Sequence, residues 1–178
     1  MSTVTLNGLT SRGMLGEAVI SEDGAYRYVL DRRWDRDLDV MPWIMLNPSV
    51  ADHETDDATV IRCMTRAIRA GYGGICVLNL FALRATDPAQ LLRHPDPAGP
   101  DNDRWLAGLA EATGHGITPV IAAWGAHGVL YDRDKRVLEL LAGCRLLCLG
   151  VTKAGQPRHP VRLGYDVPYQ PFPATLGA

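Results

Sequence analysis

Four short apolar runs alternate along the chain with segments of helical periodicity. The runs cover residues 43–46, 75–78, 119–124 and 146–149. Each is followed at once by a polar side chain or a glycine turn, as is typical of a buried strand that leaves a sheet. Short apolar strands separated by helices favour a parallel sheet that is covered on both faces. We therefore predict an α/β fold with three layers, α/β/α, around a central four-stranded parallel sheet.

The clearest helical segment follows the first run. Its apolar positions recur at the spacing of one helix face, and either Asp57 or Thr59 is expected to cap its first turn. These apolar positions are Val60, Ile61, Met64 and Ile68. Further helices are expected at about 101–112 and in the segment that ends near residue 142.

An antiparallel hairpin is predicted before the first run. Residues 17–20 and 26–30 flank Asp23-Gly24, which is a strong hairpin turn signal. Arg32 and Trp34 follow, and they lie either on a solvated hairpin edge or against nucleic acid. We expect one domain over 1–178, with a hairpin extension (1–39), an α/β core (40–165) and a proline-rich tail on the surface (166–178).

Composition limits the class of protein further. The chain has 178 residues, 47% of them hydrophobic, and no apolar stretch long enough to cross a bilayer. The first residues lack a secretory pattern, so we expect a cytoplasmic protein with no membrane partner. The four cysteines show no C-x-x-C spacing, and we expect neither a metal nor a cofactor. The formal charge of −2 argues against a broad polyanion-binding surface.

Polar side chains stand where the predicted strands end. Asn47 follows the first run and Asn79 the second. Because the carboxyl ends of parallel strands line one crevice, we expect both carboxamides there. Each has a plainer interpretation: Asn47, before Pro48, holds a tight turn, and Asn79 is a satisfied strand terminus. His159 is likewise either a site residue or a structural loop residue.

A basic loop lies near the carboxyl end of the chain. Between residues 140 and 165 there is no Asp or Glu, while Lys and Arg occur at 145, 153, 158 and 162. This loop is either a focused anion site or a solvated loop that balances the acidic stretch 52–57. Arg84 either binds an anion or pairs with an acid of that stretch.

In chain order, four motifs resemble those of the uracil-DNA glycosylase superfamily. They are Leu46-Asn47-Pro48-Ser49, Leu78-Asn79-Leu80-Phe81-Ala82-Leu83-Arg84, Ala123-Trp124-Gly125 and His159-Pro160. The resemblance implies that Asn47 positions the attacking water, Asn79 reads the edge of a flipped base, and His159 stabilises charge on the departing base.

The same resemblance suggests the other substrate-binding residues. Phe81 and Trp124 are the candidates to stack on a base, and Arg162 and Leu163 fall where that family inserts a wedge into the duplex. The remaining expected substrate contacts are Ser49, Arg84, Lys153 and Arg158. Two positions depart from the family pattern: Met45 stands in place of a glycine, and Val161 in place of a serine.

The chain also resembles, over most of residues 26–163, a bacterial and phage family catalogued only as a domain of unknown function. This likeness rests on Arg27-Tyr28, on residues 45–49, 79–88 and 99–102, and on residues 157–160.

We therefore expect a protein that hydrolyses or binds an N-glycosidic base–sugar unit, in DNA or in a nucleotide. One alternative is a metal-dependent nucleotide phosphohydrolase that uses the carboxylates of Asp52, Glu54, Asp56 and Asp57. The other is a non-catalytic domain for nucleic acid or nucleotides, with Arg32, Trp34, Arg158 and Arg162 at the contact. The sequence leaves the base and the oligomeric state open.

Overall fold

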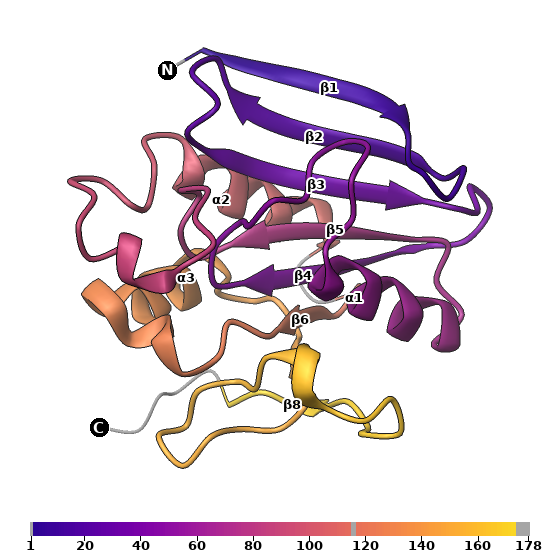
Figure 1. Ribbon diagram of the computed structural model, residues 1–178. Helices are drawn as coiled ribbons and strands as arrows, with labels where there is room; N and C mark the ends of the chain where they lie inside the picture. The colour runs from indigo at the N-terminus through magenta and orange to yellow at the C-terminus, as the bar shows by residue number, and fades with distance from the viewer. Residues whose placement is uncertain (1, 115–116, 174–178) are drawn as a thin grey trace.

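A mixed α/β structure is built on one eight-stranded sheet, as the computed structural model shows for residues 2–114 and 117–173 (Figure 1). The sheet has the order β1-β2-β3-β5-β4-β6-β7-β8. The strands are β1 (Thr3–Leu9), β2 (Leu15–Ser21), β3 (Arg27–Arg33), β4 (Val40–Met45), β5 (Gly74–Asn79), β6 (Val120–Ala122), β7 (Leu146–Cys148) and β8 (Gln170–Pro171).

The four apolar runs form the middle of this sheet. They lie in β4, β5, β6 and β7, and each neighbouring pair among them is parallel. The prediction of an α/β fold is confirmed. From β4 the chain crosses to β5 on one side and then to β6 on the other, so the strand order reverses at β4. In open α/β sheets, ligands bind in the crevice at such a point.

The N-terminal hairpin is confirmed and is larger than expected. β2 and β3 pair antiparallel around the predicted turn, and β3 also pairs antiparallel with β5. The hairpin therefore continues the main sheet. The sequence did not predict β1, which pairs with β2 at the edge and is mostly exposed, so it shows little hydrophobic alternation.

The expectation of a surface tail is wrong for Phe172, whereas residues 170–171 are exposed and form the edge strand β8. β8 pairs antiparallel with β7, and Phe172 is only 5% exposed within the main hydrophobic core. Burial of this aromatic ring against Trp124 fixes the segment. Of the predicted tail, residues 174–178 lie outside the described residues.

Three α-helices are found in the described part of the chain. They are α1 (Ala58–Arg69), α2 (Asn102–Ala112) and α3 (Arg133–Leu140). Asp57 caps α1, because its Oδ1 accepts hydrogen bonds from the backbone N–H groups of Thr59 and Val60, both at 2.9 Å. This confirms the first of the two caps that the sequence left open. None of these helices combines the length and apolarity needed to span a bilayer.

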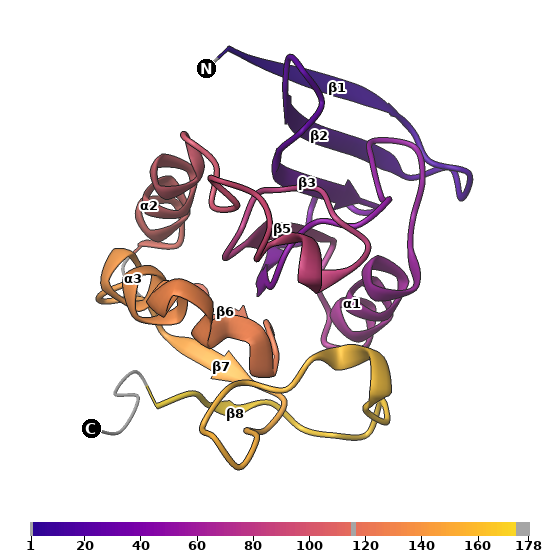
Figure 2. The same ribbon diagram turned by 60° about the vertical axis from the view of Figure 1, so that its left-hand side comes forward.

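Side chains alternate between two hydrophobic clusters along the central strands. Met41 and Trp43 of β4 pack in the cluster that contains Met64 of α1. Ile44 packs in the other cluster, which includes Leu106 of α2 and residues of α3. Figure 2 shows α1 well separated from α2 and α3. The two clusters cover the two faces of the sheet, so a binding site is expected at the carboxyl ends of the strands.

Both interpretations of Arg32, on a solvated hairpin edge or against nucleic acid, are wrong, because the residue is buried. It is fully buried, and its Nε donates to Asp56 Oδ1 at 2.7 Å, while Nη2 donates to the carbonyls of Asp52 and Thr55. A buried guanidinium requires such partners. Trp34 is partly buried and donates from Nε1 to the carbonyl of Tyr72 at 2.9 Å. The hairpin thus uses both residues to hold neighbouring segments.

Candidate active site at the carboxyl edge of the sheet

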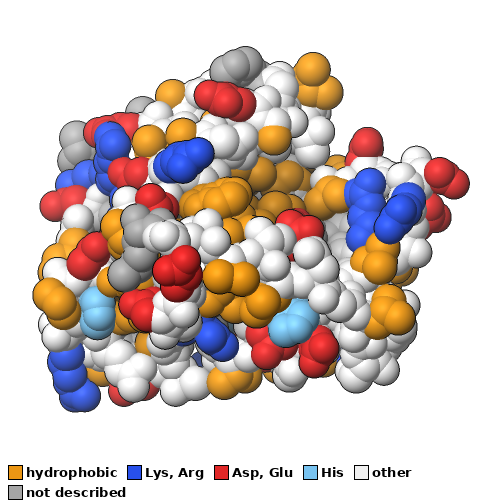
Figure 3. All heavy atoms as spheres, turned by 90° about the horizontal axis from the view of Figure 1, so that it is seen from above, with side chains coloured by type: hydrophobic (Ala, Val, Ile, Leu, Met, Phe, Trp, Pro, Cys, Tyr) orange, Lys and Arg blue, Asp and Glu red, His pale blue; other side chains and the backbone are white. Residues whose placement is uncertain are grey.

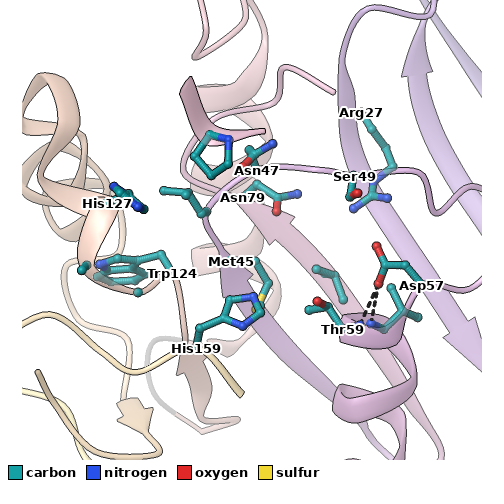
Figure 4. Close-up of a pocket in the computed structure, with 16 residues that line it drawn as sticks. Arg27, Met45, Asn47, Ser49, Asp57, Thr59, Asn79, Trp124, His127 and His159 are labelled. Atoms are coloured by element: carbon teal, nitrogen blue, oxygen red, sulfur yellow. Dashed lines mark hydrogen bonds between the residues drawn. The ribbon is translucent and has the colours of Figure 1, made fainter. Parts of the chain in front are cut away.

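A pocket of about 290 Å³ opens where the sequence placed the crevice (Figure 4). The ends of β4, β5 and β6 form its floor and one wall, and the first turn of α1 forms another. Asn47, Ser49, Asn79, Trp124 and His159 all line it. The structure therefore brings together five predicted site residues from four separate stretches of the chain.

Hydrogen bonds fix the orientation of the Asn47 carboxamide. Its Nδ2 donates to the carbonyls of Pro48, at 3.0 Å, and Ala85, at 2.7 Å. Only the NH₂ end of an amide donates to a carbonyl, so the two contacts decide which end is which. Both Nδ2 hydrogens are used, and Oδ1 is left as an acceptor. The side chain supports the turn and also presents a fixed carbonyl oxygen.

Asn79 presents an unpaired buried amide to the same pocket. The residue is 1% exposed, and neither Oδ1 nor Nδ2 has a hydrogen-bond partner among the described residues. Its backbone carbonyl is held by Nδ2 of Asn102 at 3.0 Å, so the strand end is fixed while the side chain is not. Leaving a buried polar group unpaired costs about 1–3 kcal/mol, which a ligand with matching groups recovers.

His159 borders the pocket with one ring nitrogen committed to its own loop. Nδ1 accepts a hydrogen bond from the backbone N–H of Val161 at 3.4 Å. The neutral ring therefore carries its proton on Nε2. Burial lowers the pKa of His159 below its ordinary value, against an opposing effect of the Asp57 carboxylate. The favoured form is a neutral imidazole that donates from Nε2.

Of the two predicted stacking residues, only Trp124 reaches the pocket. Its Nε1 donates to Gln156 Oε1 at 2.6 Å, and Gln156 in turn donates to Asp134 Oδ2 at 2.7 Å. This buried chain of hydrogen bonds holds the indole in place. Phe81 is 1% exposed inside the core, with its ring against Tyr131, so the expectation that it stacks on a base is wrong. Phe81 packs in the core cluster that contains Leu106 and does not line the pocket.

Sequence reasoning missed several lining residues, of which Arg27 is the most distinctive. Arg27 begins β3, which runs antiparallel to β5, so the amino end of β3 lies beside the carboxyl end of β5. A charged residue within the apolar run 26–30 was the available signal. Asp57, Thr59 and the exposed His127 are the other polar lining residues that it missed.

A second, more open hollow of about 500 Å³ adjoins the pocket and shares Gly125, Ala126 and His159 with it. Arg158, Arg162 and Leu163 line this hollow, and both arginines are exposed. Lys153 is exposed and lines neither cavity.

The prediction for Arg84 is not supported. It lies outside both cavities, and its Nη1 donates to the carbonyl of Gly24 at 3.3 Å, not to an acid of the 52–57 stretch. The side chain closes the hairpin turn.

The acidic stretch does not form a cation site. Asp52 accepts from the backbone N–H groups of Glu54 and Thr55, Asp56 pairs with Arg32, and Asp57 caps α1. Within 2–114 and 117–173, no three His, Cys, Asp or Glu side chains are grouped so as to hold a metal. Asp52, Asp56 and Asp57 each have a structural partner instead, and Glu54 is exposed beside His53, so no observation favours the phosphohydrolase.

Residues 27–161 match the family model described as "Protein of unknown function (DUF1643)". The match covers most of the chain, and the protein belongs to this family. No curated protein and no solved structure gives a significant match. The matched region includes every residue that lines the pocket.

Proposed function

We propose that this protein is a uracil-DNA glycosylase-like hydrolase that binds a base–sugar unit in the pocket and cleaves its N-glycosidic bond. The proposal includes the finer architecture, in which α1 covers one face of the parallel strands β5, β4, β6 and β7, and α2 and α3 cover the other. The unpaired Asn79 amide is the observation that carries the proposal. A nucleobase edge offers both a donor and an acceptor, which are the two hydrogen-bond partners that this amide lacks.

The chemistry requires one water and one leaving group. Water attacks the anomeric carbon as the carbon–nitrogen bond breaks, the bonding electrons leave with the base, and the water proton is released. Asn47 Oδ1 is fixed as an acceptor and orients that water by proximity. Nε2 of His159 donates toward the charge that develops on the base, a stabilisation worth about 10²–10³ in rate.

The dimensions of the pocket agree with this substrate class. Its volume of about 290 Å³ is at the small end of ligand sites in proteins. Trp124 supplies an aromatic wall, and Met45 and Val60 supply apolar contacts. Met45, one of the departures from the family pattern, narrows the pocket from the sheet side.

Release of free base tests the proposal directly. Oligonucleotides that carry uracil, mismatched thymine, modified pyrimidines or hypoxanthine, and free purine and pyrimidine nucleosides and nucleotides, are incubated with the protein and analysed for free base by chromatography. We expect release to fall at least about 100-fold in Asn47→Ala. The exposed Asn7→Ala on β1 is the matched control and should keep the wild-type rate.

An unchanged rate in Asn47→Ala contradicts the glycosidic mechanism. Tight binding of these compounds without any release selects the non-catalytic alternative for the same pocket.

A further inference from the structure

Arg27 is a buried cation that the proposed mechanism does not use. Its side chain lines the pocket, the residue is 3% exposed, and it forms no ion pair with any described residue. Burial lowers the pKa of Arg27 to about 10, which leaves the guanidinium charged at neutral pH. The Asp57 carboxylate is the anion that acts on Arg27 most strongly, but it forms no ion pair with it, so the N–H groups of this buried cation that lack a partner point to a ligand.

One edge of the guanidinium makes no hydrogen bond to the described residues. Nη1 donates to the carbonyl of Ala51 at 2.6 Å and ties Arg27 to the segment that leads toward α1. Nε is buried and has no partner among the described residues. The Nε–Nη2 edge offers two parallel N–H groups, the geometry with which arginine holds a pair of neighbouring acceptors.

The surroundings disfavour a phosphate as that partner. The N-terminus of α1 is a natural anion site, but Asp57 already occupies the N–H groups of Thr59 and Val60. The Asp57 carboxylate also points toward the Arg27 guanidinium in the pocket (Figure 4). A dianion at Arg27 would meet this negative charge. An uncharged ligand with acceptors for Arg27 and a donor for Asp57 meets no such repulsion.

We propose that the pocket selects a 6-oxopurine base, guanine or hypoxanthine, through Arg27. O6 and N7 of such a base are neighbouring acceptors that match the free Arg27 edge. The ring also carries a donor N–H, which suits Asp57 Oδ2 or the Oδ1 of Asn79. Adenine presents a donor amino group in place of O6 and is disfavoured. This inference rests on the proposed function, for which it names the base.

Calorimetric titration with five probes tests the inference: guanosine, 7-deazaguanosine, adenosine, uridine and inorganic phosphate. We expect guanosine to bind at least about tenfold more tightly than adenosine or uridine. Replacing N7 by C–H, in 7-deazaguanosine, should weaken binding to the wild type by about tenfold and to Arg27→Met by less than about twofold. Arg84→Met, which removes a neighbouring arginine outside the pocket, is the matched control and should retain the full effect.

Arg27→Lys keeps the charge but lacks the two parallel N–H groups, so its binding of guanosine should no longer depend on N7. Because this variant retains the buried cation and should fold, it replaces Arg27→Met in the test if that variant does not fold. Equal binding of guanosine and uridine, no effect of the N7 replacement, or Arg27-dependent binding of phosphate alone overturns this inference and leaves the glycosidic proposal standing. If none of the four nucleosides binds, the proposed function itself fails.

Discussion

The most informative single residue is Asn79, because its side-chain amide is buried and forms no hydrogen bond with any described residue. A polar group kept at a cost in stability is typical of a binding site. The Asn102 amide is equally buried, but its Nδ2 donates to two backbone carbonyls. We therefore assign a structural role to Asn102 and a ligand-binding role to Asn79.

Asn79→Leu should leave the protein as stable or more stable, by up to about 1–3 kcal/mol, because an unpaired buried amide is replaced by an apolar side chain of similar branching. Denaturant unfolding measures the change. Asn102→Leu is the comparison and should lower the free energy of unfolding, since it removes the Nδ2 donor from the carbonyls of Asn79 and Leu80, although the Leu80 carbonyl keeps its bond from Arg133 Nε. A loss of stability in Asn79→Leu as large as that in Asn102→Leu would show that Asn79 is structural.

His159 makes stability depend on pH with a defined sign. Its pKa in the folded protein is lowered by burial, so the unfolded chain binds a proton more readily as the pH falls past 6.5. The contribution of His159 is therefore present above pH 6.5 and is lost as the pH falls through the lowered value. His159→Asn keeps an acceptor for the Val161 N–H, and it should reduce the loss of stability between pH 7.5 and 5. Unfolding curves with the same pH slope in both proteins would contradict this.

At the scale of elements, two buried arginines of β3 hold the segment between β4 and α1. Arg27 donates to the carbonyl of Ala51, and Arg32 bonds to Asp52, Thr55 and Asp56. The same segment packs closely on β2, where a Cβ at Gly16 would clash with the carbonyl oxygen of His53. The wall of the pocket that carries Asp57 is thus positioned by the hairpin.

Arg32→Met should destabilise the protein by about 3–5 kcal/mol, because it leaves the Asp56 carboxylate, 3% exposed, without its buried cation and with only the half-exposed Arg12 at 3.8 Å. Chemical denaturation measures this loss. The matched control is Arg33→Met on the same strand, which removes a single weak hydrogen bond and should cost less than about 1 kcal/mol. Adding Asp56→Asn to Arg32→Met should recover part of the loss, and no recovery would mean that the arginine acts mainly by packing.

At the scale of the whole molecule, the N-terminal strands differ in what they contribute. β1 is an exposed edge strand, while Ala18, Val19 and Ile20 of β2 are buried in the two hydrophobic clusters. The view of the face above β1 shows hydrophobic side chains at its centre with charged ones around them (Figure 3). The family model begins at residue 27 and so omits both strands, although β2 belongs to the core.

Removing residues 2–9 should lower the melting temperature by roughly 5–10 °C and keep a single cooperative transition, because few buried apolar side chains are lost. Removing residues 2–21 should abolish cooperative unfolding, since it opens both clusters. Thermal scans followed by circular dichroism distinguish the two variants. A cooperative transition in the longer deletion would place the fold wholly within residues 22–178.

The sequence alone determined the features that depend on neighbouring residues. The four apolar runs predicted β4 to β7, Asp57 was recognised as a possible helix cap, and Asn47 and Asn79 were placed at strand ends. Hydrophobic periodicity and capping act over a few residues, so a short stretch contains the whole signal. The rule that parallel strands share one carboxyl edge then predicted the crevice.

Only the tertiary structure decided which side chains meet across that crevice. The acid that pairs with buried Arg32 is Asp56, 24 residues further along the chain, and Phe81 is buried in the core. Arg27 lines the pocket because β3 runs antiparallel to β5. The unpaired state of the Asn79 amide likewise depends on every neighbour at once. Pairing, burial and the satisfaction of hydrogen bonds are properties of contacts between distant segments, and no local pattern in the chain encodes them.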